Sequence, residues 1–165
     1  MTTMSCGLDS MFSELQLTRY AEVLLWGLGV ARRQRFRPRD VILVRFDPPA
    51  VRLAEILYRC ILERGMHPVI RMNPTPAMEQ SFFQCATDPQ LFFTPPGEEP
   101  LYRQLNGSIF LHAPESLTHL SGVDPKKIGR AAAAKKFLRD IMTERESSGR
   151  LSWTLCLFPT EELAR

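Results

Sequence analysis

Residues 40–72, DVILVRFDPPAVRLAEILYRCILERGMHPVIRM, decide the expected fold of the chain. The continuous apolar run at 41–44 predicts a strand that is buried on both faces. Apolar residues then recur at helical spacing from Ala50 to Ile61, with charged residues on the opposite side. Asp47 is expected to cap this helix and Gly65 to end it. A second short strand at 67–72 completes a right-handed βαβ unit with parallel strands.

The flanking segments continue the alternation of helices and strands. A helix is expected at 14–33, before the first strand, because its apolar residues share one helical face. Short helices separated by prolines are expected near 77–85, 88–93 and 98–105. Two further strands are expected at 108–112 and 150–158. A single helix that begins with Asp124 as its cap and Pro125 in its first turn should lie between them.

This order predicts one α/β domain over residues 1–165. The expected domain has three layers and a mostly parallel sheet of about four or five strands, built from βαβ units and preceded by an amino-terminal helix. The last strand is expected to leave one of its faces uncovered, because no full helix follows it in the sequence.

Composition limits the class of protein. The chain has 165 residues and 44% hydrophobic residues, which suffices for one core, and no apolar run approaches the ~18 residues of a membrane span. Its start lacks the basic and apolar regions of a secretory signal. The four cysteines are far apart in sequence, which favours isolated, mostly buried thiols in a reducing cytosol: Cys6, Cys60, Cys85 and Cys156. A cytoplasmic location without membrane contact is therefore expected.

Residues 31–39, ARRQRFRPR, concentrate five arginines in a chain whose net charge is only +3. They follow the first predicted helix, so a solvated helix end that suits the helix dipole is the favoured interpretation. A phosphate or nucleic-acid contact through Arg32, Arg33 and Arg35 is the alternative. Nucleic acid is not expected as a partner, because a broader basic surface with stacking aromatic residues would be needed.

Polar residues that follow the predicted strands form the candidate site. Asp47, Asn73 and His112 each stand at a strand end close to a proline. The carboxyl ends of parallel strands border the crevice in which ligands bind, so these residues are predicted to line one rim, as a ligand site or a domain interface. The alternative is that each only caps or turns into the next helix.

Known catalytic motifs are missing from the sequence. It has no HExxH, GxSxG, GxxxxGK[ST] or GxGxxG motif. His112 and His119 flank Ser116, but a metal site or a catalytic triad would need a further convergent ligand or base. We therefore assign no catalytic residue and no metal ligand to this chain.

Six segments, in order, carry a resemblance to a known family: YAEVLL (20–25), VILVR (41–45), LAEILYRCILERGMHPVIRM (53–72), ATDPQLFFTPP (86–96), LSGVDPKKIGRAAAAKKFLRDIMTERE (120–146) and SWTLCLFPTEELA (152–164). Together they resemble the amino-terminal domain of the aminopeptidase T family of metallo-aminopeptidases, which includes the aminopeptidase T and aminopeptidase S types. The segment at 120–146 is the most specific.

The resemblance implies a cytoplasmic enzyme that removes amino-terminal residues from peptides. In this family two divalent metal ions (zinc, cobalt or magnesium) activate the attacking water, and Glu, His and Asp side chains of a larger carboxyl-terminal domain hold them. Members are usually dimers. The sequence stops before that catalytic domain, so the resemblance implies a truncated, non-catalytic chain that binds no metal and is inactive alone.

Peptide substrates are then expected only where the catalytic domain is supplied, and a homodimer is the expected assembly. The alternative is a stand-alone α/β module for small-ligand binding or dimerisation. In that case Asn73, His112 and the helix starts would hold a small anionic ligand.

Overall fold

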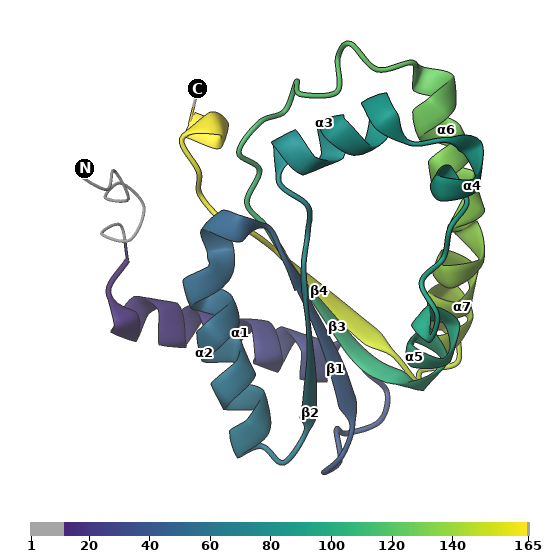
Figure 1. Ribbon diagram of the computed structural model, residues 1–165. Coiled ribbons are helices and arrows are strands. Elements are labelled where there is room, and N and C mark those ends of the chain that lie inside the picture. Colours follow the sequence, from purple (N-terminus) through teal and green to yellow (C-terminus); the bar gives the residue numbers. More distant parts are fainter. Residues whose placement is uncertain (1–11, 165) are drawn as a thin grey trace.

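The computed structural model describes residues 12–164 and shows a parallel sheet between two layers of helices (Figure 1). The strands are β1 (Val41–Phe46), β2 (His67–Met72), β3 (Leu105–His112) and β4 (Ser152–Leu157). They pair in the order β2-β1-β3-β4, and every pair is parallel. The predicted α/β class with a parallel sheet is confirmed. Cys6 lies outside the described residues.

One face of the sheet is covered by α1 (Glu14–Val30) and α2 (Val51–Glu63), which also pack against each other (Figure 1). The main core lies between these helices and the sheet, and it includes Leu28, Val44, Leu57 and Ile109. The apolar residues predicted to form the inner face of α2 are buried. Gly65, at a φ of 72°, follows the end of α2 as predicted.

The other face is covered only in part, by α5 (Glu98–Gln104) and α7 (Lys136–Ser147). These two helices pack on each other and enclose a second, smaller core around Leu43, Leu105 and Leu151. Beyond this core the exposed β4 side chains Trp153, Leu155 and Leu157 leave that face open, as the sequence predicted for the last strand.

The predicted single helix after Asp124 is wrong, because the structure has two: α6 (Pro125–Ala134) and α7, which are separated at Lys135. Asp124 caps α6 as predicted, since its Oδ1 accepts a hydrogen bond from the backbone N–H of Lys126 at 2.9 Å. The two helices pack on different partners. Ala131 of α6 joins a third cluster with residues of α3 (Pro76–Cys85) and α4 (Asp88–Leu91), whereas α7 packs on α5.

The segment after α1 also differs from the prediction. The helix ends at Val30 rather than near residue 33, and Arg32 is not solvated. The Arg32 side chain is only 6% exposed, its Nη1 lies 2.9 Å from Asp40 Oδ2, and its guanidinium stacks on the Phe36 ring. An ion pair and an aromatic face therefore hold this arginine against the protein. The other four arginines of the run are exposed, as expected.

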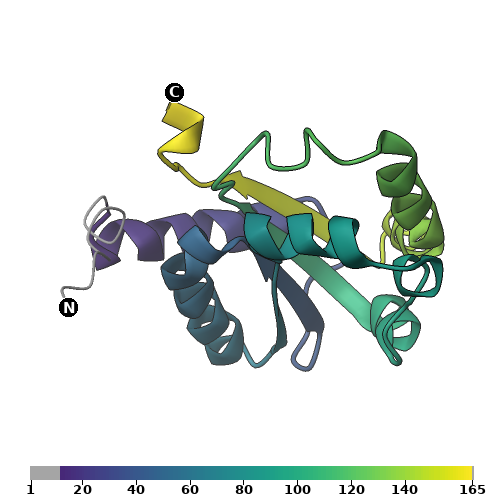
Figure 2. The same cartoon turned by 45° about the horizontal axis from the view of Figure 1, so that its top comes forward.

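Short 3-10 turns follow two of the strands: η1 (Pro48–Ala50) after β1 and η2 (Glu162–Ala164) after β4. Turned forward in Figure 2, the molecule shows α3 lying across the carboxyl end of the sheet. None of the described helices is long and apolar enough to cross a membrane.

Candidate functional site

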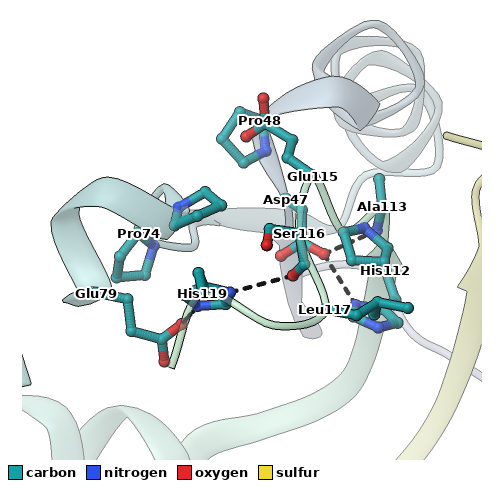
Figure 3. A pocket seen from close by; sticks show the side chains of 12 residues that line it. Asp47, Pro48, Pro74, Glu79, His112, Ala113, Glu115, Ser116, Leu117 and His119 are labelled. Atoms are coloured by element: carbon teal, nitrogen blue, oxygen red, sulfur yellow. Dashed lines mark hydrogen bonds and ion pairs between the residues drawn. The ribbon is translucent and has the colours of Figure 1, made fainter. Parts of the chain in front are cut away.

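The strand order places a topological switch point between β1 and β3. The chain leaves β1 toward β2 on one side and later returns to β3 on the other side. In open parallel sheets the crevice at such a point, outside the carboxyl ends of the strands, is where ligands bind. A pocket of about 260 Å³ opens there, lined by the segments that follow β1, β2 and β3 (Figure 3).

The Asp47 carboxylate ties three strand ends together. Its Oδ1 accepts a hydrogen bond from the side-chain amide of Asn73 at 2.6 Å. Its Oδ2 accepts one from the backbone N–H of Ala113 at 2.7 Å and lies 2.9 Å from Nδ1 of His112. The prediction that Asp47 caps the following helix is wrong, because no capping hydrogen bond forms there and both oxygens face the rim. The structure thus brings Asp47, Asn73 and His112 together.

These contacts assign the proton on His112. A carboxylate oxygen can only accept, so Nδ1 of His112 donates to Asp47, and in the neutral form of the ring Nε2 is the acceptor. Nε2 has no hydrogen-bond partner within residues 12–164, and the side chain is 39% exposed. The Phe110 ring packs beside the imidazole at 5.3 Å between centroids. In its neutral form His112 therefore offers the pocket one oriented, accessible proton acceptor.

A second histidine–carboxylate pair closes the other side of the pocket. Nε2 of His119 lies 2.8 Å from Oε2 of Glu79 on α3, and its Nδ1 lies 3.1 Å from the backbone oxygen of Ser116. The loop that follows β3 is thereby fastened to α3 (Figure 3). Glu79 and His119 were not among the predicted site residues. They are 40 positions apart, and no local spacing signal links them.

These residues do not fit a metal site or a catalytic triad. Both nitrogens of His119 are already engaged, and His112 directs Nδ1 to Asp47. Across residues 12–164 no three His, Cys, Asp or Glu side chains are grouped so as to hold a metal ion. His119 contacts the backbone of Ser116 rather than its hydroxyl, so a histidine-activated serine is not assembled either.

The lining favours a cation over an anion. Three carboxylates reach the pocket, those of Asp47, Glu79 and Glu115, and Glu115 is exposed. Much of the remaining wall is proline, which has no N–H to donate to a phosphate or carboxylate: Pro48, Pro74, Pro76 and Pro114. A ligand with an ammonium group therefore suits this pocket better than the small anion of the alternative interpretation of the sequence.

Comparisons with known proteins give one family and one fold. The sequence profile of a family described as thermophilic metalloprotease (M29) matches residues 13–165. A search of curated proteins found no significant match. Among solved structures, wild-type AmpT from Thermus thermophilus is similar with a TM-score of 0.64 and 16% sequence identity. The alignment covers 89% of this chain and 36% of AmpT, so the chain spans little more than a third of that protein's length.

Proposed function

Because the chain belongs to the thermophilic metalloprotease family M29, we propose that it serves as the amino-terminal domain of a metal-dependent aminopeptidase of the aminopeptidase T or aminopeptidase S type. The family match over residues 13–165 carries this proposal. It is supported by the fold shared with AmpT and by the resemblance of six segments to that family. The reaction of the complete enzyme would be removal of amino-terminal residues from peptides, in the cytoplasm.

In the proposed enzyme the metal ions are bound outside this chain. Zinc, cobalt or magnesium ions would be held by a catalytic domain, and residues 1–165 would act as one supporting domain that does not hydrolyse peptides alone. The rim formed by Asp47, Asn73 and His112 would meet that domain or the peptide. This assignment agrees with the donor set at the rim, whose carboxylate and imidazole groups already bond to each other.

The proposal is tested by hydrolysis of amino-acid p-nitroanilides with added cobalt, zinc or magnesium. The chain alone should show no turnover that a chelator abolishes. The same chain joined to an M29 catalytic domain should show it. Chelator-sensitive turnover by the chain alone would contradict the non-catalytic assignment, and an inactive joined protein that binds metal normally would contradict the supporting role.

A small-ligand module is the second candidate, and the pocket at the switch point favours it. The exposed Glu115 carboxylate and Nε2 of His112, which have no partner within residues 12–164, suit a primary ammonium group. Leucinamide should therefore raise the melting temperature, whereas phosphate at equal ionic strength should not. Glu115→Gln should weaken the effect of leucinamide. Stabilisation by phosphate alone would instead support the anionic ligand of the alternative interpretation of the sequence.

A homodimer is also proposed, and the outer face of α1 supports it. Opposite its buried face, α1 presents an exposed apolar row made of Leu15, Val23, Trp26 and Val30. In one antiparallel register with a second copy, Leu15 would lie opposite Val30 and Arg19 opposite Trp26, a pairing that would allow a cation–π contact. Sedimentation equilibrium should show a dimer that Trp26→Ser dissociates, while Trp153→Ser, at another exposed tryptophan, leaves it intact.

A further inference from the structure

A second cleft lies on the partly covered face of the sheet. Its volume is about 390 Å³, and it lies between α7 and the strands β3 and β4. It shares no lining residue with the pocket at the switch point. Its walls are largely apolar: Trp153 and Leu155 are each 51% exposed, and Met142 of α7 faces them across the cleft.

Arg45 reaches this cleft from β1. Its guanidinium stacks on the Phe110 ring, 5.0 Å from the centroid. Its Nε is buried without a hydrogen-bond partner, and within residues 12–164 no carboxylate forms an ion pair with it. A charge held against apolar side chains without a counter-ion is unfavourable, so the cleft contains an unmatched positive group.

The acidic groups nearby are bonded to residues other than Arg45. Glu98 pairs with Arg71 at 3.1 Å, and Glu146, which lines the cleft, accepts the indole N–H of Trp153 at 2.9 Å. Burial raises the pKa of Tyr102, so this phenol stays neutral and supplies no anion. Ser108, only 3% exposed at the cleft floor, makes no side-chain hydrogen bond to any residue within 12–164. The Arg45 Nε and the Ser108 hydroxyl are therefore two donors of the cleft without an acceptor among residues 12–164.

We propose that this cleft binds a ligand in which a carboxylate is joined to an apolar group. The carboxylate contacts Arg45, and the apolar group packs against Trp153 and Leu155. Arg139 of α7 also lines the cleft, but it donates to the backbone oxygen of Ala132 at 3.2 Å. A singly charged anion matches the lining, in which Arg45 and Arg139 are opposed by the one carboxylate of Glu146. The inference goes beyond the proposed function, and it depends neither on a metal ion nor on a catalytic domain.

A matched pair of compounds tests the role of the carboxylate. N-acetyl-L-leucine carries a carboxylate beside an isobutyl group, and N-acetyl-L-leucinamide has the same shape without the charge. Titration is followed by the indole N–H resonance of Trp153, assigned with Trp26→Phe as reference. The acid should bind about tenfold or more tightly than the amide, the difference expected for a charge-assisted hydrogen bond.

Three variants locate the site. Arg45→Met keeps an unbranched apolar side chain but removes the guanidinium that stacks on Phe110, and it should remove the preference for the acid. Arg45→Lys should retain part of that preference. Glu146→Gln preserves an acceptor for Trp153 and should tighten acid binding by about two- to fivefold, because one repulsive charge is lost. Arg103→Met is the control, since Arg103 is exposed and pairs with Glu99 on α5. It should leave binding unchanged.

Several results would overturn the proposal. Equal affinity for the acid and the amide would show that only apolar contact matters. Unchanged acid binding in a folded Arg45→Met protein would show that Arg45 does not hold the carboxylate. Competition by inorganic phosphate at lower concentration than the acid would indicate a general anion site. If Arg45→Met does not fold, judged by circular dichroism, the acid–amide comparison in the wild type decides.

Discussion

His112 Nδ1 lies 2.9 Å from Asp47 Oδ2, so the end of β3 is bonded directly to the end of β1. The two residues are 65 positions apart in sequence. Since Asn73 at the end of β2 bonds the other oxygen of the same carboxylate, one side chain fastens three strand ends. The rim of the switch point is therefore held in place by polar contacts rather than by packing alone.

Replacing Asp47 should destabilise the protein more than replacing another carboxylate of the same pocket. Asp47→Asn removes the charge that accepts three hydrogen bonds and should lower the free energy of unfolding by about 1–3 kcal/mol. Glu115→Gln, at an exposed carboxylate, should change it by less than about 0.5 kcal/mol. Urea unfolding followed by circular dichroism measures both. Equal losses in the two variants would show that the three-way contact contributes little.

Ser152 connects the edge strand to the first helix. Its buried hydroxyl donates to the backbone oxygen of Leu28 at 2.8 Å, near the end of α1, where helix carbonyls lack intrahelical partners. Ser152→Ala should therefore reduce the free energy of unfolding by about 1–2 kcal/mol. The exposed Ser147, which bonds within its own helix, is the control, and Ser147→Ala should have little effect. An unchanged free energy of unfolding in Ser152→Ala would mean that a water molecule donates to the Leu28 oxygen in place of the serine.

Gly107 and Gly129 should respond to alanine in opposite directions. A Cβ on Gly107 would lie 2.9 Å from side-chain atoms of both Ile42 and Leu28, so Gly107→Ala forces the main core to move. It should destabilise the protein by about 1–3 kcal/mol. Nothing lies within 4 Å of a Cβ on Gly129 in α6, where alanine should stabilise by about 0.5–1 kcal/mol. Melting temperatures that shift in the same direction would disprove this packing argument.

The thiols should differ in reactivity with pH. Cys85 is exposed, contrary to the expectation of mostly buried thiols, whereas Cys60 is buried. Burial raises the pKa of the half-buried Cys156, so less of it is thiolate at a given pH, and thiolate is the reactive form. In a Cys6→Ser background, iodoacetamide should modify Cys85 first. The rate at which Cys156 is modified should rise only at higher pH than the rate for Cys85.

Peptide mass spectrometry gives the two rates, and unfolding in urea supplies the control, because both cysteines should then react alike. A Cys156 rate equal to that of Cys85 in the folded protein would contradict the effect of burial.

Most helices and strands could be predicted from the hydrophobic pattern of neighbouring residues. The run 41–44, the apolar face of α2 and the φ of Gly65 were all predictable, because burial periodicity and glycine's freedom at positive φ act over neighbouring residues. The strand ends carrying Asp47, Asn73 and His112 were predictable for the same reason. That these three residues meet also required β1 to lie between β2 and β3, which the tertiary structure decided.

Tertiary contacts decided the rest. The helix after Asp124 is interrupted at Lys135 because its halves pack on different partners, α3 and α4 for the first and α5 for the second. Asp47 was expected to cap a helix but bonds His112, and Arg32 was expected to be solvated but pairs with Asp40. In both cases the fold brings an oppositely charged or hydrogen-bonding partner within reach of the charged group. The sequence alone determined where strands and helices form, since those preferences are local. Only the tertiary structure decided which charged side chains pair over long separations in sequence. Glu79 pairs with His119, 40 positions away, and Asp47 with His112, 65 positions away. Such contacts depend on distance in space, so no regular spacing in the sequence predicts them.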